Sequence, residues 1–167
     1  GSGVVTSETA FGNPTQFTAC AWLKYNTATT NPTIVARSNG SVDVDGMWTL
    51  GLNAGPNPKA RVHLNGTTRT VIGTTSFSTG VWSQECMTYD GTTLKLYSNG
   101  ASDGSLVISD ALPSVSSALS IGTMSNGTTS NYPDPIDEVK YFNRVFTDKE
   151  IKAEYDAGAA GNAAGLS

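Results

Sequence analysis

Short segments in which apolar and polar residues alternate predict a protein built from β-strands. In residues 60–65, Val62 and Leu64 alternate with polar neighbours, as on a strand with one buried face. Leu94 and Leu96 alternate in the same way with polar or amphipathic neighbours. Together with runs rich in Thr, Val, Ile and aromatic residues, this pattern predicts strands at 17–25, 47–53, 60–65, 81–89, 94–98 and 136–142.

Dipeptides typical of tight hairpins separate these segments. They are Asn39-Gly40, Asp45-Gly46, Asn65-Gly66, Asp90-Gly91, Asn99-Gly100, Asp103-Gly104 and Asn126-Gly127. Type I′ turns need a positive φ at both central residues, which Asn, Asp and Gly tolerate best. Short strands joined by such turns predict an antiparallel sandwich or barrel rather than alternating strands and helices.

A helical pattern occurs only near the C-terminal end. Thr147 and Glu150 have the spacing of a capping box, in which each residue bonds to the backbone N–H of the other. Ile151 and Tyr155 follow on one face of the predicted helix. Gly158 is predicted to end this helix.

Length and composition favour one folded domain. The chain has 167 residues, of which 38% are hydrophobic and 14% charged, and these values fit one globular core. We expect a domain over residues 1–158 and a small-residue tail or linker over 159–167. The opening Gly1-Ser2-Gly3 favours a fragment cut from a longer polypeptide.

The charge balance and hydropathy exclude two classes of partner. The net charge is −4, from ten Lys and Arg against fourteen Asp and Glu, so the chain lacks the basic face of a nucleic-acid-binding protein. No apolar run approaches the roughly 18 residues of a membrane span, so we expect no membrane insertion.

The two cysteines lie in the middle of two predicted strands, 66 positions apart. Cys20 and Cys86 are either two buried free thiols or, as we favour, a disulfide that pins the sandwich through its middle. Two Cys and one His without a C-x-x-C spacing are too few for a structural zinc site. A disulfide would place the protein in an oxidising setting outside the cytosol.

Three motifs carry a resemblance to a known family. They are Phe17-Thr18-Ala19-Cys20-Ala21-Trp22-Leu23-Lys24, the stretch from Trp82 through Tyr89-Asp90-Gly91 to Asn99-Gly100, and Ile136-Asp137-Glu138-Val139 through Arg144 to Glu150-Ile151. The chain resembles the laminin-G-like and pentraxin branch of the concanavalin A-like jelly-roll superfamily. The resemblance implies an all-β antiparallel β-sandwich jelly roll with one short C-terminal helix.

The same resemblance bears on the disulfide and on calcium. Pentraxins carry their intradomain disulfide at the positions of Cys20 and Cys86, although Gln84 and Tyr89 depart from the pentraxin signature. Pentraxins also bind paired calcium ions, through an acidic loop that corresponds here to residues 123–134. That loop has one carboxylate, whereas calcium sites usually need several, so two ions are not expected. A single, more weakly bound calcium ion is the one cofactor that we still consider.

The candidate calcium ligands are Asp43, Asp45 and Asp137. In the predicted strand 136–142, Asp137 shares its parity with Val139 and Tyr141 and is therefore expected to point into the core. An unpaired buried carboxylate is costly, so backbone amides, which we favour, or a calcium ion must satisfy it. On this interpretation, Asp137→Ala lowers the free energy of unfolding by more than about 2 kcal/mol.

Two loops are the candidate ligand-binding surface. One contains Asp43 and Asp45, and the other contains Asn131, Tyr132 and Asp134. We expect both at one edge of the sandwich, where a rigid scaffold presents loop side chains. An aromatic ring beside amide and carboxylate groups suits sugar recognition. The alternative is that Tyr132 packs against its neighbouring prolines and only holds the loop.

The sequence lacks the residue patterns of a hydrolase. A glycosidase needs two carboxylates across a cleft, and the five Glu residues do not form the E-x-D-x-x-E pattern of this superfamily's enzymes. His63, the only histidine, is expected to be an ordinary surface residue. The three Trp residues are expected in the core. We therefore predict no enzymatic activity.

These observations predict a noncatalytic recognition module. The partner is a glycan or a surface receptor, as in a lectin or an adhesion domain, and the parent polypeptide is an extracellular, cell-surface or virion protein. The alternative is a structural or assembly domain, such as a fibre or capsid decoration, that provides a protein–protein surface.

Overall fold

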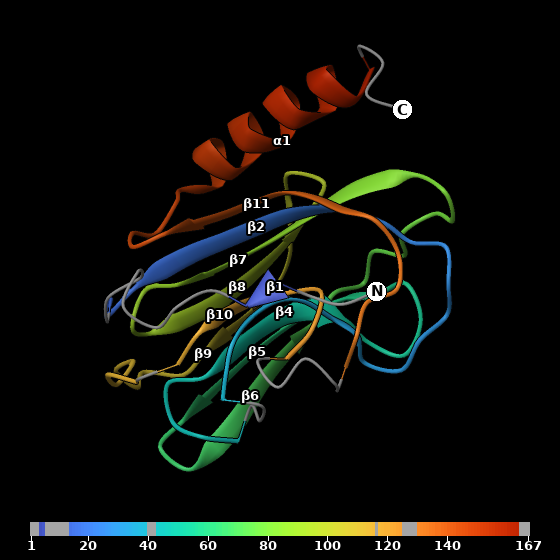
Figure 1. Cartoon of the computed structure of the whole chain (residues 1–167). Coiled ribbons are helices and arrows are strands. Elements are labelled where there is room, and N and C mark those ends of the chain that lie inside the picture. Colours follow the sequence, from blue (N-terminus) through green and yellow to red (C-terminus); the bar gives the residue numbers. More distant parts are fainter. Residues whose placement is uncertain (1–3, 6–13, 40–42, 116, 125–129, 164–167) are drawn as a thin grey trace.

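A computed structural model describes residues 4–5, 14–39, 43–115, 117–124 and 130–163. In this described part of the chain, two antiparallel sheets face each other, and one helix crosses the outside of one of them (Figure 1). The six-stranded sheet has the order β1-β10-β3-β4-β5-β6, and the five-stranded sheet has the order β11-β2-β7-β8-β9. This is the predicted antiparallel β-sandwich with one C-terminal helix.

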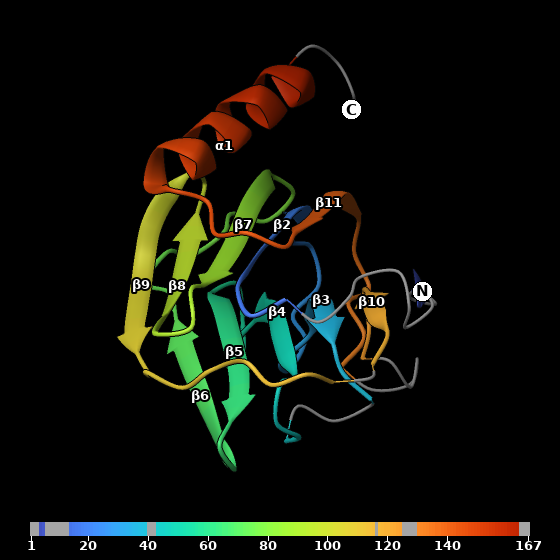
Figure 2. The ribbon, with the colours of Figure 1, turned by 90° about the vertical axis from the view of Figure 1, so that its left-hand side faces the viewer.

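The predicted strands are confirmed, and the structure adds strands that the pattern did not indicate. The elements are β1 (Val4–Val5), β2 (Phe17–Lys24), β3 (Thr33–Arg37), β4 (Trp48–Leu52), β5 (Pro58–Leu64), β6 (Thr67–Ile72), β7 (Trp82–Tyr89), β8 (Thr93–Ser98), β9 (Ala101–Val107), β10 (Leu119–Ile121), β11 (Ile136–Phe142) and α1 (Asp148–Ala163). The added strands are β1, β3, β6, β9 and β10. Strands β6 and β9 each form one edge of their sheet and lie on the same side of the sandwich (Figure 2). Among the described residues, no helix is long and apolar enough to cross a membrane.

Two of the predicted turns form hairpins with the expected backbone. Asn65 and Gly66 have φ values of 51° and 70°, and Asn99 and Gly100 have values of 49° and 77°, so both dipeptides reverse the chain between neighbouring strands. The prediction of a turn at Asp103-Gly104 is wrong, because this dipeptide lies inside β9, next to a shift in its register with β8. Gly40 and the Asn126-Gly127 dipeptide lie outside the described residues.

The main core fills the space between the two sheets. Phe17 from one sheet stacks on Trp48 from the other, with ring centroids 4.7 Å apart, and Tyr141 stacks on Trp48 at 5.8 Å. The apolar residues of β5 and β8 point into this space and are fully or almost fully buried. These contacts fill the space between the sheets, so a ligand must bind on an outer face or at an end of the sandwich.

A second, smaller core lies between the five-stranded sheet and α1. The capping box is confirmed: Glu150 N–H donates to Thr147 Oγ1 at 3.2 Å, and Thr147 N–H donates to Glu150 Oε2 at 2.8 Å. The prediction that Gly158 ends the helix is wrong, because α1 continues to Ala163. Gly158 instead packs on the indole of Trp22, which also stacks on Tyr155 at 5.5 Å. The expected boundary at residue 158 therefore falls inside the helix.

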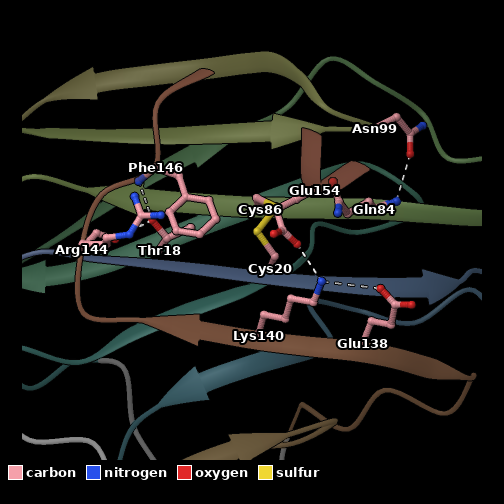
Figure 3. The surroundings of a disulfide bond; sticks show 10 residues. All are labelled: Thr18, Cys20, Gln84, Cys86, Asn99, Glu138, Lys140, Arg144, Phe146 and Glu154. Carbon is pink, nitrogen blue, oxygen red and sulfur yellow. Dashed lines mark hydrogen bonds and ion pairs between the residues drawn. A yellow bond between two sulfur atoms is a disulfide. The ribbon is translucent and has the colours of Figure 1, made fainter. Parts of the chain in front are cut away.

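The disulfide between Cys20 and Cys86 is confirmed, and its place in the sandwich differs from the expectation. The two residues face each other on neighbouring strands, β2 and β7, of the same sheet (Figure 3). The bond therefore links two strands within one layer and does not join the two layers. Phe146 and Ile151 cover it, and both cysteines are at most 1% exposed.

Candidate functional site

A cleft lies on the outer face of the six-stranded sheet, over its β4–β6 side. Its volume is about 470 Å³, and its lining residues are Asn31, Asn53, Lys59, Arg61, Thr70, Ile72 and Ser130. The alternation along β5 puts Lys59 and Arg61 on the outer face, while Ala60 and Val62 point into the core. Register places Ile72 beside Lys59 and Thr70 beside Arg61. The pleat of two paired strands therefore forms the floor of the cleft.

Lys59 is held firmly in this cleft and is unusually buried for a lysine. Its exposed fraction is 6%, and its ammonium group donates a hydrogen bond to Asn31 Oδ1 at 2.6 Å. Burial and the nearby positive charge of Arg61 lower the pKa of Lys59 to about 8, while the carboxyl of Glu85 acts in the opposite direction. Lys59 is thus still mostly protonated at neutral pH, and a charged group that binds beside it would change its pKa further.

The rim of the cleft has two residues in the left-handed backbone conformation. Asn31 has a φ of 51° and Ser130 a φ of 54°. A hydrogen bond from Thr33 N–H to the Ser130 carbonyl, at 2.7 Å, fastens the Ser130 loop to the start of β3. A left-handed conformation is costly for a serine, and such residues concentrate at functional sites. The rim is therefore preformed by the fold.

Among the described residues that line the cleft, there is no pair of acids that could hydrolyse a glycosidic bond. Its lining consists of amides, hydroxyls, two cations and one isoleucine, with no Asp or Glu among the described lining residues. A glycosidase needs a carboxylic acid and a carboxylate on opposite sides of the bond. The arrangement can bind a polar ligand through many hydrogen bonds, and its described lining lacks the two carboxyl groups that a glycosidase uses.

The loop that contains Asp43 and Asp45 closes over His63. Asp43 Oδ1 accepts a hydrogen bond from Thr68 Oγ1 at 2.8 Å, and Asp45 Oδ1 accepts one from Gly66 N–H at 2.9 Å. The His63 ring lies 3.6 Å from Asp45 and 3.9 Å from Asp43. His63 is 9% exposed, so its expected role as an ordinary surface residue is wrong. The parity of β5 does place it on the outer face, but the loop covers it.

The loop that contains Asn131, Tyr132 and Asp134 lies at the other end of the six-stranded sheet. This loop connects β10 to β11, and a hydrogen bond from Thr33 N–H to the Ser130 carbonyl holds it at the start of β3. The Asp43 loop follows the other end of β3. The expectation that both loops share one edge of the sandwich is therefore wrong. Antiparallel strands place successive loops at opposite ends, and the two loops belong to different ends.

Within that second loop, two of the three predicted residues serve the fold. Tyr132 is 4% exposed, belongs to the main core and donates its hydroxyl to the Lys24 carbonyl at 3.0 Å. Asp134 accepts hydrogen bonds from the backbone N–H groups of Asn26 and Thr27, at 2.8 and 2.7 Å. Asn131 is exposed and accepts a bond from Thr123 Oγ1 at 2.7 Å. Tyr132 thus offers no free ring face to a ligand.

Asp137 does not point into the core. The pairing of β11 with β2 shifts between Asp137 and Lys140, and Glu138 has a φ of 45°, so a β-bulge reverses the parity at this point. Val139 and Tyr141 still pack on the main core, while Asp137 is exposed and accepts a bond from Glu138 N–H at 2.8 Å. Because Asp137 is exposed, the reason to expect a large loss of stability in Asp137→Ala no longer holds.

The structure does not bring Asp43, Asp45 and Asp137 together. Asp137 lies on the five-stranded sheet, near the end of β2 at Trp22, whereas Asp43 and Asp45 lie beside the β5–β6 hairpin of the other sheet. Protein donors already occupy Oδ1 of each of the latter two carboxylates. Among the residues that the structure describes, no group of three or more His, Cys, Asp or Glu side chains could hold a metal ion.

The carboxyl group inside the sandwich belongs to Glu85. This residue is fully buried on β7, between Ala21 and Ser98 on the neighbouring strands, and neither carboxyl oxygen has a hydrogen-bond partner among the described residues. Burial raises the pKa of Glu85 well above its usual value, and the charge of Lys59 only partly offsets this effect. The sequence could have indicated that Glu85 points inward, because it lies at alternate positions of β7 with Met87 and Tyr89, which belong to the main core.

We expect Glu85 to make the protein less stable as the pH rises. The folded state keeps the proton at pH values where the unfolded chain, with its lower pKa, has released it, so the free energy of unfolding falls above pH 4.5. The loss approaches about 1.4 kcal/mol per pH unit until the folded form also ionises. In Glu85→Gln we expect this decrease with pH to disappear. Urea unfolding of the wild type and of Glu85→Gln between pH 4 and 8 measures the free energy of unfolding of each.

Glu138→Gln is the control for the Glu85 experiment, because Glu138 is exposed and this substitution also removes one carboxylate. Its stability should follow the wild-type pH profile closely. Parallel profiles for the wild type and Glu85→Gln would show that Glu85 ionises normally inside the sandwich.

The residues of the cleft were not among the sequence candidates. Lys59 and Arg61 could have been found, since two cations at alternate positions share one strand face. Asn31, Asn53 and Ser130 come from separate loops, and no local pattern in the sequence brings them together.

Comparisons with known proteins identify relatives of this fold. The CBM40 domain of the Ruminococcus gnavus IT-sialidase, in complex with α2,3-sialyllactose, superposes with a TM-score of 0.74 at 14% identity, over 93% of this chain and 97% of that one. Domain 4 of AbnA, a GH43 extracellular arabinanase from Geobacillus stearothermophilus, in complex with arabinotriose, gives a TM-score of 0.67 at 16% identity, over 90% of this chain and 71% of that one.

A pentraxin is also similar, as the motifs suggested. The heptameric SAP-like pentraxin from Limulus polyphemus gives a TM-score of 0.62 at 12% identity, over 90% of this chain and 79% of that one. A search of curated protein sequences gave no match. The sequence profile of the concanavalin A-like lectin/glucanases superfamily, in its laminin G branch, matches residues 1–152. The chain therefore belongs to the concanavalin A-like lectin/glucanases superfamily.

Proposed function

We propose that this domain is a noncatalytic recognition module that binds a glycan in the cleft on its six-stranded sheet. The observation that carries the proposal is the lining of the cleft, where amides, hydroxyls and cations surround one apolar side chain, Ile72. Sugars present hydroxyl groups around an apolar ring, and such a lining can satisfy both. The volume of about 470 Å³ lies within the usual range for small-ligand sites.

Similar structures support a binding role without fixing the ligand. The CBM40 domain was solved with sialyllactose and the arabinanase domain with arabinotriose, while the binding domain of botulinum neurotoxin DC was solved with rat synaptotagmin II. A glycan or a surface receptor is therefore the class of partner that we propose. The buried disulfide fits a parent protein that is extracellular, on a cell surface or on a virion.

A glycan array tests the proposal, and a chelator tests the role of metal. We expect saturable binding that EDTA leaves unchanged, because protein donors already engage Asp43 and Asp45. The same array is repeated with added calcium. Loss of binding with EDTA would show that a metal ion takes part after all.

The alternative function is an assembly domain with a protein–protein surface. One observation favours it: Ile72, Leu106 and Val107 are 49%, 37% and 72% exposed on β6 and β9, which are edge strands of the two sheets. Exposed edge strands can pair with another chain. A silent glycan array together with a defined oligomer in light scattering would favour this function.

A further inference from the structure

The cleft holds two positive side chains, and its described lining contains no carboxylate to balance them. Lys59 and Arg61 stand two positions apart on β5 and project from the same face. The acidic neighbour of Arg61 is Asp43, 3.8 Å from the guanidinium group and 68% exposed. Water screens such an exposed pair, and a guanidinium carries five N–H donors, so Arg61 keeps donors for a ligand.

These two cations raise the free energy of the empty cleft. Lys59 has lost most of its contact with water, and its hydrogen bond to Asn31 uses one of its three donors. Arg61 disfavours the charged form of Lys59, and Glu85, whose own pKa burial raises, offsets this effect only in part. An anion between the two side chains would relieve their repulsion and satisfy the remaining donors. The protein as a whole is acidic, with a net charge of −4, so this local positive charge stands out from its surroundings.

We propose that the cleft selects acidic saccharides and that Arg61 and Lys59 bind the carboxylate directly. This inference rests on the proposed function, since it names the ligand class of the same cleft. The planar guanidinium group of Arg61 can donate two parallel hydrogen bonds to a carboxylate, and the ammonium group of Lys59 can donate a third. The remaining lining groups then contact the sugar: its hydroxyls meet Asn53 and Thr70, and its ring packs on Ile72.

A glycan array that pairs each carboxylate-bearing glycan with its neutral counterpart tests the selectivity. Sialyllactose with lactose, and oligogalacturonate with its methyl ester, are two such pairs. We expect at least tenfold tighter binding of the acidic member, and calorimetry should show that this preference weakens as the salt concentration rises. Glycans that carry sulfate in place of carboxylate are included as a separate arm.

Two variants with the same change in net charge locate the effect. Arg61→Gln should weaken binding of the acidic glycan at least tenfold and remove the preference over its neutral counterpart. Lys152→Gln removes one positive charge from the exposed side of α1. It should change neither the affinity for the acidic glycan nor the preference over its neutral counterpart. Thermal unfolding of both variants checks that they fold, and Arg61 is partly exposed on an outer face, so we expect little change.

The wild-type protein provides a second readout, which needs no variant. In the cleft, Arg61 and Asn31 lie beside Lys59, while Glu85 acts on it from inside the sandwich, and the pKa of Lys59 is about 8. As the pH rises from 7 to 9, Lys59 loses its proton, so affinity for the acidic glycan should fall up to tenfold. Affinity for neutral glycans should stay constant over this range.

The outcomes separate this inference from the proposed function. Equal binding of acidic and neutral glycans, binding of neutral or sulfated glycans alone, or unchanged binding by Arg61→Gln overturns the inference and leaves the glycan-binding function intact. An array without any binding overturns both.

Discussion

Loss of the Cys20–Cys86 bond is expected to lower the free energy of unfolding by about 4 kcal/mol. The bond joins residues 66 positions apart, so it restricts a long stretch of the unfolded chain and removes much of its conformational entropy. A typical domain has only about 5–15 kcal/mol of stability in total. Reduction should therefore shift the urea midpoint far toward lower concentrations. Urea unfolding of the wild type with and without a reductant measures the difference.

The comparison of oxidised and reduced wild type is better controlled than a pair of alanine variants. Both forms have the same side chains, whereas Cys20→Ala and Cys86→Ala also remove sulfur atoms from the small core under α1. Since both cysteines are almost fully buried, we expect reduction only after the protein unfolds. Equal midpoints for the two forms would contradict the prediction.

Substitution of Gly158 by alanine is expected to destabilise the protein by about 1–3 kcal/mol, against the intrinsic helical preference for alanine. A Cβ at this position would lie 2.3 Å from Nε1 of Trp22, and other ring atoms follow at 2.6 and 2.8 Å. The ring cannot move aside easily, because it stacks on Tyr155 and is 4% exposed. The helix must therefore shift away from the five-stranded sheet. Thermal unfolding measures the result.

Gly161 offers a matched control on the same helix. A Cβ at this position would meet no atom within 4 Å, so Gly161→Ala should stabilise the protein by up to about 1 kcal/mol. The two substitutions make the same chemical change, and opposite signs are expected. If both variants were stabilised, the contact between Gly158 and Trp22 would not hold the helix in place.

The sequence predicted the class of fold, several of the strands, the start of the helix and the disulfide. These features depend on local patterns: alternation for β5, the capping box at Thr147, and the family motifs around the cysteines. It also predicted a binding module rather than an enzyme, and that function stays a prediction, while the similar structures share the fold. The site residues were a weaker prediction, because Tyr132 and Asp134 hold loops together and Asp137 is exposed.

The amino-acid sequence by itself determined where six of the strands lie and which faces of regular strands such as β5 are apolar, because both depend on neighbours along the chain. Only the tertiary structure decided where the loops lie and which polar groups meet. A single bulge at Glu138 turned Asp137 outward, and a loop covered His63. The cleft arises in the same way, since Asn31 and Ser130 reach Lys59 only after distant strands pair. Strand pairing joins residues far apart in sequence, and no local pattern records that register.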